Sequence, residues 1–295
     1  MKRKLMSLIA RTITGLVYIA IMLGVIISNS VVAVGMVFAL MAGLACYEYQ
    51  NIVQINRQDF ILKILHSVMA ALAVYISFAA LTAGMTSRQY LVALLPYVAY
   101  YLYFTIGELF RRREQPFSEV SHAFFAHIYV AIPLGLLLSM SLGAYQLDST
   151  GVLAKSVIFP RTFWLLPIFV FVWLNDTGAY LVGSLIGRRK LFVRISPKKT
   201  VEGAIGGVFF ALLGALVFYY FLPELSPWYH WVILAFIVAL FATLGDLFES
   251  LLKRTYNVKD SGKMLPGHGG ILDRIDSILI AALPAYMYVM LAIYL

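Results

Sequence analysis

The sequence predicts an all-α polytopic integral membrane protein with about nine transmembrane helices, and three observations lead to this prediction. Of the 295 residues, 62% are hydrophobic and 13% are charged, whereas a soluble domain carries about 25% charged residues. Several uncharged stretches reach the roughly 20 residues that a helix needs to cross a bilayer. The basic residues gather in alternate connections between these stretches, as they do in the cytoplasmic loops of membrane proteins.

Five spans are predicted in the N-terminal part. Residues 13–47 contain no charge and are too long for a single span. The sequence Ser28-Asn29-Ser30 is therefore interpreted as a turn between two spans. A cleavable signal peptide is the alternative, although a second apolar stretch follows at once. The next three spans are predicted at residues 64–83, 90–109 and 122–142.

Four further spans are predicted at residues 163–186, 201–222, 231–252 and 277–295. With a cytoplasmic N-terminus, the inside loops hold all of the 23 Lys and Arg except Arg88, Lys155 and Arg161. This bias places the N-terminus in the cytoplasm and the C-terminus outside. It also accounts for the net charge of +9, so no nucleic-acid partner is expected. The single cysteine, Cys46, excludes an internal disulfide and a Cys-based zinc site.

Acidic residues inside spans are costly and mark functional positions, and they gather in the second half of the chain. Those that lie in or beside predicted spans are Asp176, Glu202, Asp246, Glu249 and Asp276. In the first half, Glu48 and Glu108 stand at span ends and are interpreted as solvated carboxylates. The chain is therefore divided into an N-terminal membrane scaffold of about five spans, residues 1–160, and a C-terminal catalytic membrane domain of about four spans, residues 161–295.

The stretch from Gly245 to Asp276 concentrates acids, bases and glycines. Asp246 and Glu249 are spaced i,i+3, as are Asp273 and Asp276, so each pair shares a helix face if its segment is helical. Between the two pairs lie basic residues and the turn Pro266-Gly267-His268-Gly269-Gly270. Carboxylates around a basic, glycine-rich loop indicate metal-assisted phosphate chemistry. The sequence contains no Walker loop, no Gly-x-Ser-x-Gly elbow and no His-Glu-x-x-His helix.

Residues 250–276 carry the resemblance to a known family. They read Ser-x-Leu-Lys-Arg, then Lys-Asp-x-Gly, then Leu-Pro-x-His-Gly-Gly-Ile-x-Asp-Arg-Ile-Asp. This segment resembles, without a departure over its 27 positions, the signature of the phosphatidate cytidylyltransferases, also called CDP-diacylglycerol synthases. Residues 196–203 and 176–180 resemble other blocks of that family. The resemblance is close over residues 165–280, whereas the first 160 residues agree only in being multi-span.

The resemblance implies an enzyme, a nucleotidyltransferase that transfers CMP from CTP to phosphatidate and releases CDP-diacylglycerol and pyrophosphate. It implies Mg²⁺ held by Asp246 and Asp273, together with a second cation such as K⁺. It further implies a homodimer in the bacterial cytoplasmic (inner) membrane. The distribution of basic residues predicts that the site lies on the cytoplasmic face. Because a phosphate monoester needs no strong general base, His268 is interpreted as a phosphate donor.

The candidate site residues fall into three groups by their chemistry. The catalytic candidates are Asp246, Asp273, Lys253, Arg254 and His268. Basic side chains, hydroxyls and glycine amides suit the phosphates of the two substrates, and these candidates are Ser196, Lys198, Lys199, Thr200, Ser250, Lys259, Gly267, Gly269, Gly270 and Arg274. Carboxylates expected to support the metal ligands are Asp176, Glu202, Glu249 and Asp276.

An ion-coupled secondary transporter is the alternative function. Intramembrane acids and broken helices also mark ion-coupled transport. That function predicts acids near the middle of the membrane and an internal repeat. Most acids here stand near span ends, and the sequence shows no repeat, so the enzyme is preferred.

Overall fold

The computed structural model describes residues 2–54, 59–82, 86–140, 162, 164–262, 264 and 269–294, which are mostly helical. The chain forms two compact units. Unit 1 contains Met1–Arg161 and Asp260–Asp273, and unit 2 contains Thr162–Lys259 and Arg274–Leu295. The Asp260–Asp273 segment thus belongs to the unit of the N-terminal helices. The functional division at residue 160 stays a prediction.

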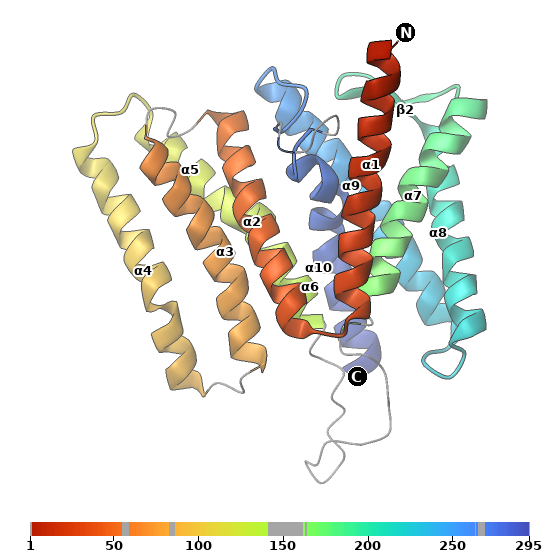
Figure 1. The fold of residues 1–295 in the computed structure, drawn as a ribbon, viewed down its shortest axis with the longest axis horizontal. Helices are drawn as coiled ribbons and strands as arrows, with labels where there is room; N and C mark the ends of the chain where they lie inside the picture. The colour runs from red at the N-terminus through yellow and green to blue at the C-terminus, as the bar shows by residue number, and fades with distance from the viewer. Residues whose placement is uncertain are drawn as a thin grey trace. The chain divides into compact units, whose positions relative to one another are not determined.

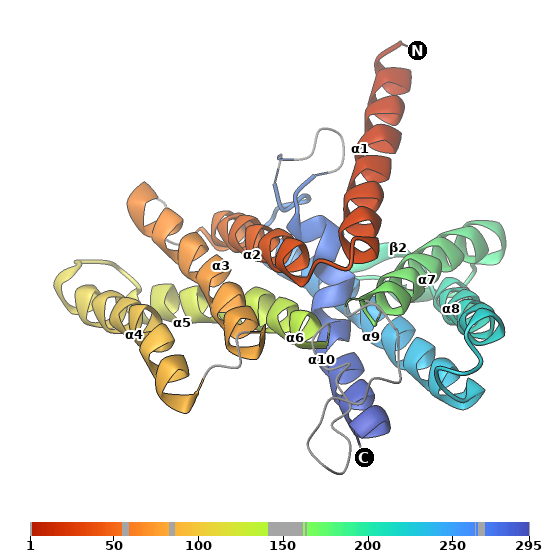
Figure 2. The same cartoon turned by 60° about the horizontal axis from the view of Figure 1, so that its bottom comes forward.

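The helices of unit 1 follow the predicted order. They are α1 (Lys2–Ile27), α2 (Val31–Val53), α3 (Phe60–Thr82), α4 (Ser87–Phe110), α5 (Pro116–Ala126), the π-helical turn η1 (His127–Ala131) and α6 (Ile132–Met140). The turn predicted at residues 28–30 is confirmed. Asn29 adopts a left-handed φ of 53°, and the Ser30 side chain accepts a hydrogen bond from the Ala33 amide at 3.3 Å as the N-cap of α2. Helices α2 and α3 lie side by side (Figures 1 and 2).

Two buried histidines, His66 and His127, bind tyrosine hydroxyls and so hold helices of unit 1 together. His66 Nδ1 lies 2.5 Å from the Tyr100 hydroxyl, and His127 Nδ1 lies 2.6 Å from the Tyr97 hydroxyl. The other ring nitrogen of His127 lies 3.0 Å from the His66 carbonyl oxygen. These bonds satisfy polar atoms in an apolar core, so the two imidazoles have a structural role here.

Unit 2 consists of α7 (Leu165–Ile186), the strands β1 (Lys190–Phe192) and β2 (Ser196–Thr200), α8 (Val201–Phe221), α9 (Trp228–Thr255) and α10 (Leu272–Tyr294), apart from the first residues of α10. The two strands pair antiparallel, with Lys190 opposite Thr200 and Phe192 opposite Ser196. This small hairpin corrects the predicted all-α fold. Its strands are short, basic and largely exposed, so they lack the alternation of apolar and polar residues that marks a strand.

Helices α7 and α8 pack closely because glycines line their contact. A Cβ added to Gly178 would lie 2.8 Å from the Gly206 carbonyl oxygen, and one added to Gly206 would clash with the Val182 side chain. Figures 1 and 2 show the two helices running side by side. Small residues at helix contacts are a common way to hold helices together in a membrane, where van der Waals packing replaces the hydrophobic effect.

Replacement of Gly206 by alanine is expected to destabilise unit 2. The new methyl group would meet the branched carbon of Val182, so the two helices must separate, which costs about 1–3 kcal/mol in an overpacked core. Thermal unfolding in detergent measures the loss. Gly24→Ala is the matched control, because a Cβ at Gly24 on α1 meets nothing within 4 Å. Equal melting temperatures for Gly206→Ala and the wild type would contradict the close contact.

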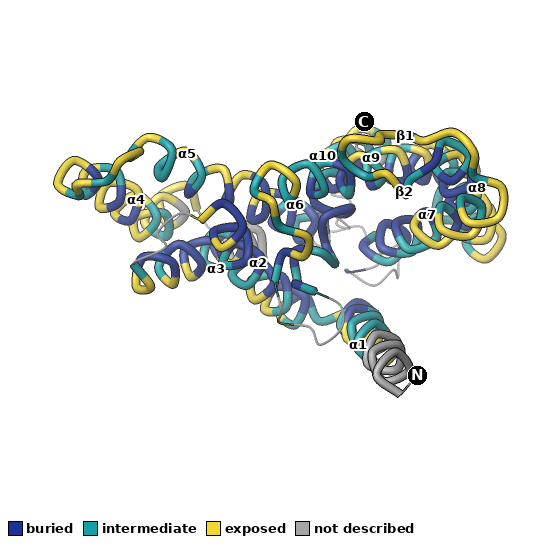
Figure 3. Tube along the Cα trace, turned by 90° about the horizontal axis from the view of Figure 1, so that it is seen from above, coloured by how far each residue is buried: buried dark blue, intermediate teal, exposed yellow. Residues whose placement is uncertain are grey.

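Seven helices in the described residues are long and apolar enough to cross a membrane, and two shorter apolar segments, Ile13–Ile27 and Phe60–Ile76, belong to α1 and α3. Exposed positions on α4 and α8 (Figure 3) carry large hydrophobic side chains, as expected of surfaces in contact with lipid. The chain is therefore a multi-pass membrane protein. The count of nine spans and the orientation of the two termini stay predictions.

Candidate functional site

The basic hairpin of unit 2 is fastened to the last third of α9. Lys199, on β2, forms an ion pair with Asp246 on α9. The Ser250 hydroxyl donates to Asp246 Oδ1 at 3.4 Å. Further along, Arg254 Nε donates to the Ile195 carbonyl oxygen at 3.4 Å. The structure thus brings together a predicted metal ligand and two predicted substrate-binding residues.

Four carboxylates from three helices of unit 2 form an acidic cluster, which is defined by Asp176 on α7, Asp246 and Glu249 on α9, and Asp276 on α10. Asp276 is buried and interacts electrostatically with the other three. The approach of α10 to α9 is close, because a Cβ on Gly245 would lie 2.6 Å from the Asp276 carbonyl oxygen. Four acids this close together need positive charge nearby if they are to stay ionised.

Positive side chains surround the acidic cluster. Lys253 Nζ lies 2.5 Å from Glu249 Oε2, and Glu249 is fully buried. Lys199 and Arg274 interact electrostatically with Asp176, which is itself exposed. A site that contains both charges can hold a cation and the anions that the cation neutralises.

The donor chemistry of the acidic cluster fits a hard divalent cation. Its donor atoms are carboxylate oxygens, the type of ligand that Mg²⁺ prefers. Among the described residues, no group of three or more His, Cys, Asp or Glu is arranged to hold a metal ion by itself. Mg²⁺ does not require such a cage, because it takes one or two carboxylates and completes its shell with waters and substrate phosphates.

Asp273 lies in the first turn of α10, and its side chain binds backbone amides at both described ends of the Asp260–Asp273 segment. Its Oδ2 accepts the amide of Ser261 at 3.0 Å and the amide of Gly270 at 2.8 Å. Gly269 has a left-handed φ of 82°, and a Cβ there would clash with Asp273 Oδ2. The Gly270 amide, predicted to face a phosphate, donates to Asp273 in this conformation. Asp246 and Asp273 belong to different compact units, so their joint role as metal ligands stays a prediction.

The interpretation of Glu48 and Glu108 as solvated carboxylates is wrong. Glu48 is 1% exposed, and its Oε2 accepts the Ser261 hydroxyl at 3.1 Å and the Leu272 amide at 2.9 Å. Glu108 is 6% exposed and pairs with Arg111 at 2.9 Å. The predicted span that stopped at residue 47 was too short. Because α2 continues to Val53, Glu48 lies inside the helix, and a longer span would have singled it out.

Two predicted site residues have structural bonds at the start of α8. Thr200 is buried, and its hydroxyl accepts the Gly203 amide at 3.1 Å as the N-cap of the helix. The Glu202 carboxylate accepts the amides of Arg188 and Arg189, both at 3.1 Å. These bonds fix the polar connection between α7 and α8, so Glu202 supports the hairpin.

The remaining candidates are distributed as follows. Lys198, Arg254 and Lys259 are exposed, and Ser196, Ser250 and Arg274 are half-buried. Gly267 and His268 lie outside the described residues. Asn175, next to Asp176, is buried and donates from its side chain to the Thr243 hydroxyl at 3.2 Å.

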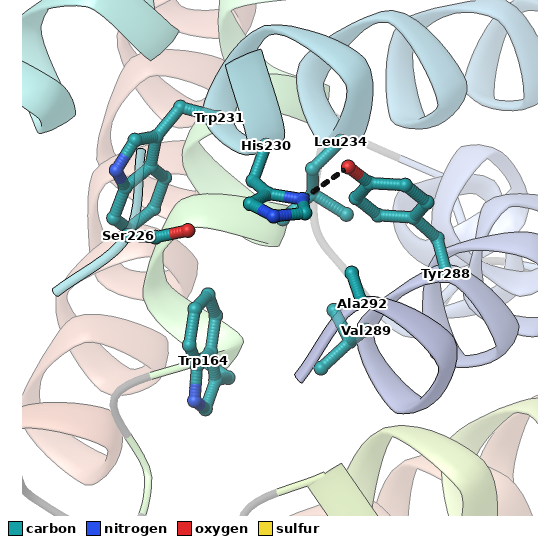
Figure 4. A pocket seen from close by; sticks show the side chains of 8 residues that line it. All are labelled: Trp164, Ser226, His230, Trp231, Leu234, Tyr288, Val289 and Ala292. Carbon is teal, nitrogen blue, oxygen red and sulfur yellow. Dashed lines mark hydrogen bonds between the residues drawn. The ribbon is translucent and has the colours of Figure 1, made fainter. Parts of the chain in front are cut away.

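A small pocket of unit 2 lies at the other end of α9 (Figure 4). Its lining includes Trp164, Trp231 and His230, and His230 Nδ1 lies 2.7 Å from the Tyr288 hydroxyl. Its volume is about 10 Å³, which is room for one water molecule. This pocket is therefore too small for a nucleotide.

Comparison with known proteins identifies related sequences. A family model described as "Cytidylyltransferase family" matches residues 9–292. A phosphatidate cytidylyltransferase from Bacillus subtilis is 47% identical over 125 residues, which are 42% of this chain and 46% of that protein. One from Staphylococcus aureus is 50% identical over 119 residues, 39% of this chain and 45% of that protein. The matched part of the chain thus spans less than half the length of these relatives.

Proposed function

Because the chain belongs to the cytidylyltransferase family, we propose that it transfers CMP from CTP to phosphatidate, and that CDP-diacylglycerol and pyrophosphate are released. The names of the similar proteins from Bacillus and Staphylococcus support this reaction. The observation that carries the proposal is the ion pair between Lys199 and Asp246, which joins a basic hairpin to an acidic cluster within one unit. The phosphates of the two substrates need positive side chains, and a divalent cation needs negative ones, so the reaction requires both kinds of charge in one site.

The reaction is an in-line displacement at the α-phosphorus of CTP. A phosphate oxygen of phosphatidate forms the new P–O bond, and the bond to the β-phosphate breaks, so pyrophosphate carries away the electron pair. Both reactants are anions. Lys199, Lys253 and Arg254 are close to the acidic cluster or to the hairpin, and they bind phosphate oxygens and reduce the repulsion between them.

Asp246 and Asp273 would hold Mg²⁺, which supplies positive charge at the triphosphate. K⁺ is the proposed second cation. Lys198, Lys259, Arg274, Ser196 and Ser250 contribute further phosphate contacts, with the backbone of Gly267 and Gly269 and with His268 as a donor. Thr200, Gly270, Asp176, Glu249 and Asp276 keep the surrounding structure and charge in place.

The site is proposed to face the cytoplasm, where CTP is found, in the inner membrane of a bacterium. The acyl chains of phosphatidate stay in the lipid while the headgroup meets the nucleotide. The basic loops support this orientation. A homodimer is proposed from the family resemblance alone.

Purified protein in mixed micelles is expected to release pyrophosphate and form CDP-diacylglycerol in equal amounts when Mg²⁺, CTP and phosphatidate are all present. Omission of phosphatidate or chelation of the metal should abolish both products, since the reaction needs a nucleophile and charge neutralisation. Labelled CTP followed into the lipid phase gives the measurement. Flux of a solute through proteoliposomes, without nucleotide turnover, would instead support the transporter.

A further inference from the structure

Glu48 is a buried acid whose hydrogen bonds reach far along the chain. Its Oε2 accepts from the Ser261 hydroxyl at 3.1 Å and from the Leu272 amide at 2.9 Å. Both donors belong to the Asp260–Asp273 segment, and both lie in unit 1 with Glu48. A buried carboxylate accepts strong bonds from such donors, because it is charged and shielded from water.

Two glycines of that segment leave room for the Glu48 carboxylate. A Cβ added to Gly262 would clash with Glu48 Oε1, and one added to Gly270 would clash with Glu48 Oε2 and with the Ser261 hydroxyl. The backbone therefore approaches the carboxylate more closely than any residue with a side chain could allow. The fit involves both described ends of the segment, so it is not a single incidental contact.

Ser261 connects Glu48 to Asp273. The Ser261 hydroxyl donates to Glu48 and accepts the Asp273 amide at 3.3 Å, while the Ser261 amide donates to Asp273 Oδ2 at 3.0 Å. Gly270 donates to the same Oδ2 at 2.8 Å. Displacement of Ser261 would therefore move one of the two amides that orient the Asp273 carboxylate.

We propose that Glu48 is a positioning residue for the reaction: it holds Ser261 and Leu272, and through them it fixes Asp273 at the start of α10. The assignment of Asp273 as a metal ligand rests on the proposed function. The anchoring of the segment by Glu48 rests only on the bonds within unit 1. A suitable experiment therefore measures the anchoring of the segment separately from the effect on the reaction.

The experiment compares Glu48→Gln with the wild type by backbone amide exchange and by steady-state kinetics. The amide oxygen of glutamine can still accept from Ser261 and Leu272, but the charge that strengthens both bonds is lost, and an NH₂ group replaces the Oε1 that lies against Gly262. Because hydrogen bonds to a charged group are stronger than those to a neutral one, the change is expected to speed exchange in residues 260–272 by about tenfold or more. We expect kcat to fall by about tenfold, KM for CTP to change less than about threefold, and the half-saturating Mg²⁺ concentration to rise.

Glu108→Gln is the matched control, because it removes the charge of another buried acid of unit 1 that pairs with Arg111 and Arg113 instead. It should lower thermal stability while exchange in residues 260–272 and the Mg²⁺ requirement stay as in the wild type. If Glu48→Gln folds poorly, Ser261→Ala is the milder change. It should raise exchange in the same residues, and the two changes combined should not be additive.

If amide exchange in residues 260–272 of Glu48→Gln equals that of the wild type, Glu48 does not hold the segment in place. Faster exchange with wild-type kcat and Mg²⁺ dependence, per folded molecule, would overturn the positioning role. Absence of turnover in the wild type would overturn the proposed function, and the exchange result would still decide whether Glu48 holds the segment.

Discussion

Asp246→Asn is expected to lower CDP-diacylglycerol formation by about 100-fold or more, because an uncharged amide replaces the proposed metal ligand. The fold should survive. The Asp246 side chain is 34% exposed and its ion-pair partner Lys199 is 26% exposed, and a partly exposed pair of this kind contributes about 1 kcal/mol to stability. Turnover at saturating CTP, together with thermal unfolding in detergent, measures the two effects.

Two further variants test the role of Asp246. Lys199→Met removes the ion pair but keeps the carboxylate, so its activity should recover at least partly at high CTP, whereas that of Asp246→Asn should not. Asp59→Asn is the matched control. Asp59 accepts the Leu62 amide at 3.0 Å at the start of α3, and its replacement should leave turnover unchanged. Near wild-type turnover in Asp246→Asn would remove this residue from the metal site.

Asp273→Asn is expected to cause a loss of similar size, also about 100-fold, with little disturbance of the neighbouring backbone. The amide oxygen of asparagine can still accept the Ser261 and Gly270 amides that bind Oδ2 now. The charge is lost, and the second carboxylate oxygen becomes an NH₂ group that cannot bind a cation. Product formation and amide exchange in residues 260–272 together give the measurement.

Asp273→Ala separates charge from hydrogen bonding at this position. It lacks an acceptor, so it should speed exchange in the segment as well as abolish turnover. If Asp273→Asn speeds exchange as much as Asp273→Ala does, the loss of activity is structural, and Asp273 is not shown to be a ligand. Full activity in Asp273→Asn would exclude it from the metal site.

The helical architecture was predictable from hydropathy, because a span must satisfy its own backbone and so must be long and apolar. The predicted turn at Ser28–Ser30 followed from the length limit of a span. Asp246 and Glu249 lie in α9, inside a predicted span, whereas Asp273 and Asp276 lie in α10, which begins at Leu272 and so before the span predicted at residues 277–295.

The hairpin and the Glu48 anchor were not predictable from local sequence. The hairpin is stabilised by contacts with other elements, such as the Lys199–Asp246 pair and the bond from the Arg254 side chain to Ile195. The residues around Glu48 show no pattern that indicates its role, because its hydrogen-bond donors, Ser261 and Leu272, lie more than 200 positions later in the sequence. Tertiary hydrogen bonds of this kind have no periodicity that a single sequence shows.

The Glu48 bonds also constrain how the chain is made. The two residues that satisfy this carboxylate stand 213 and 224 positions later in the sequence. Synthesis proceeds from the N-terminus, so unit 1 cannot be completed until α7, α8 and α9 of unit 2 have been made. The N-terminal helices therefore gain these hydrogen-bond donors only late in synthesis. A chain interrupted before residue 261 would keep the Glu48 carboxylate in α2 without either donor.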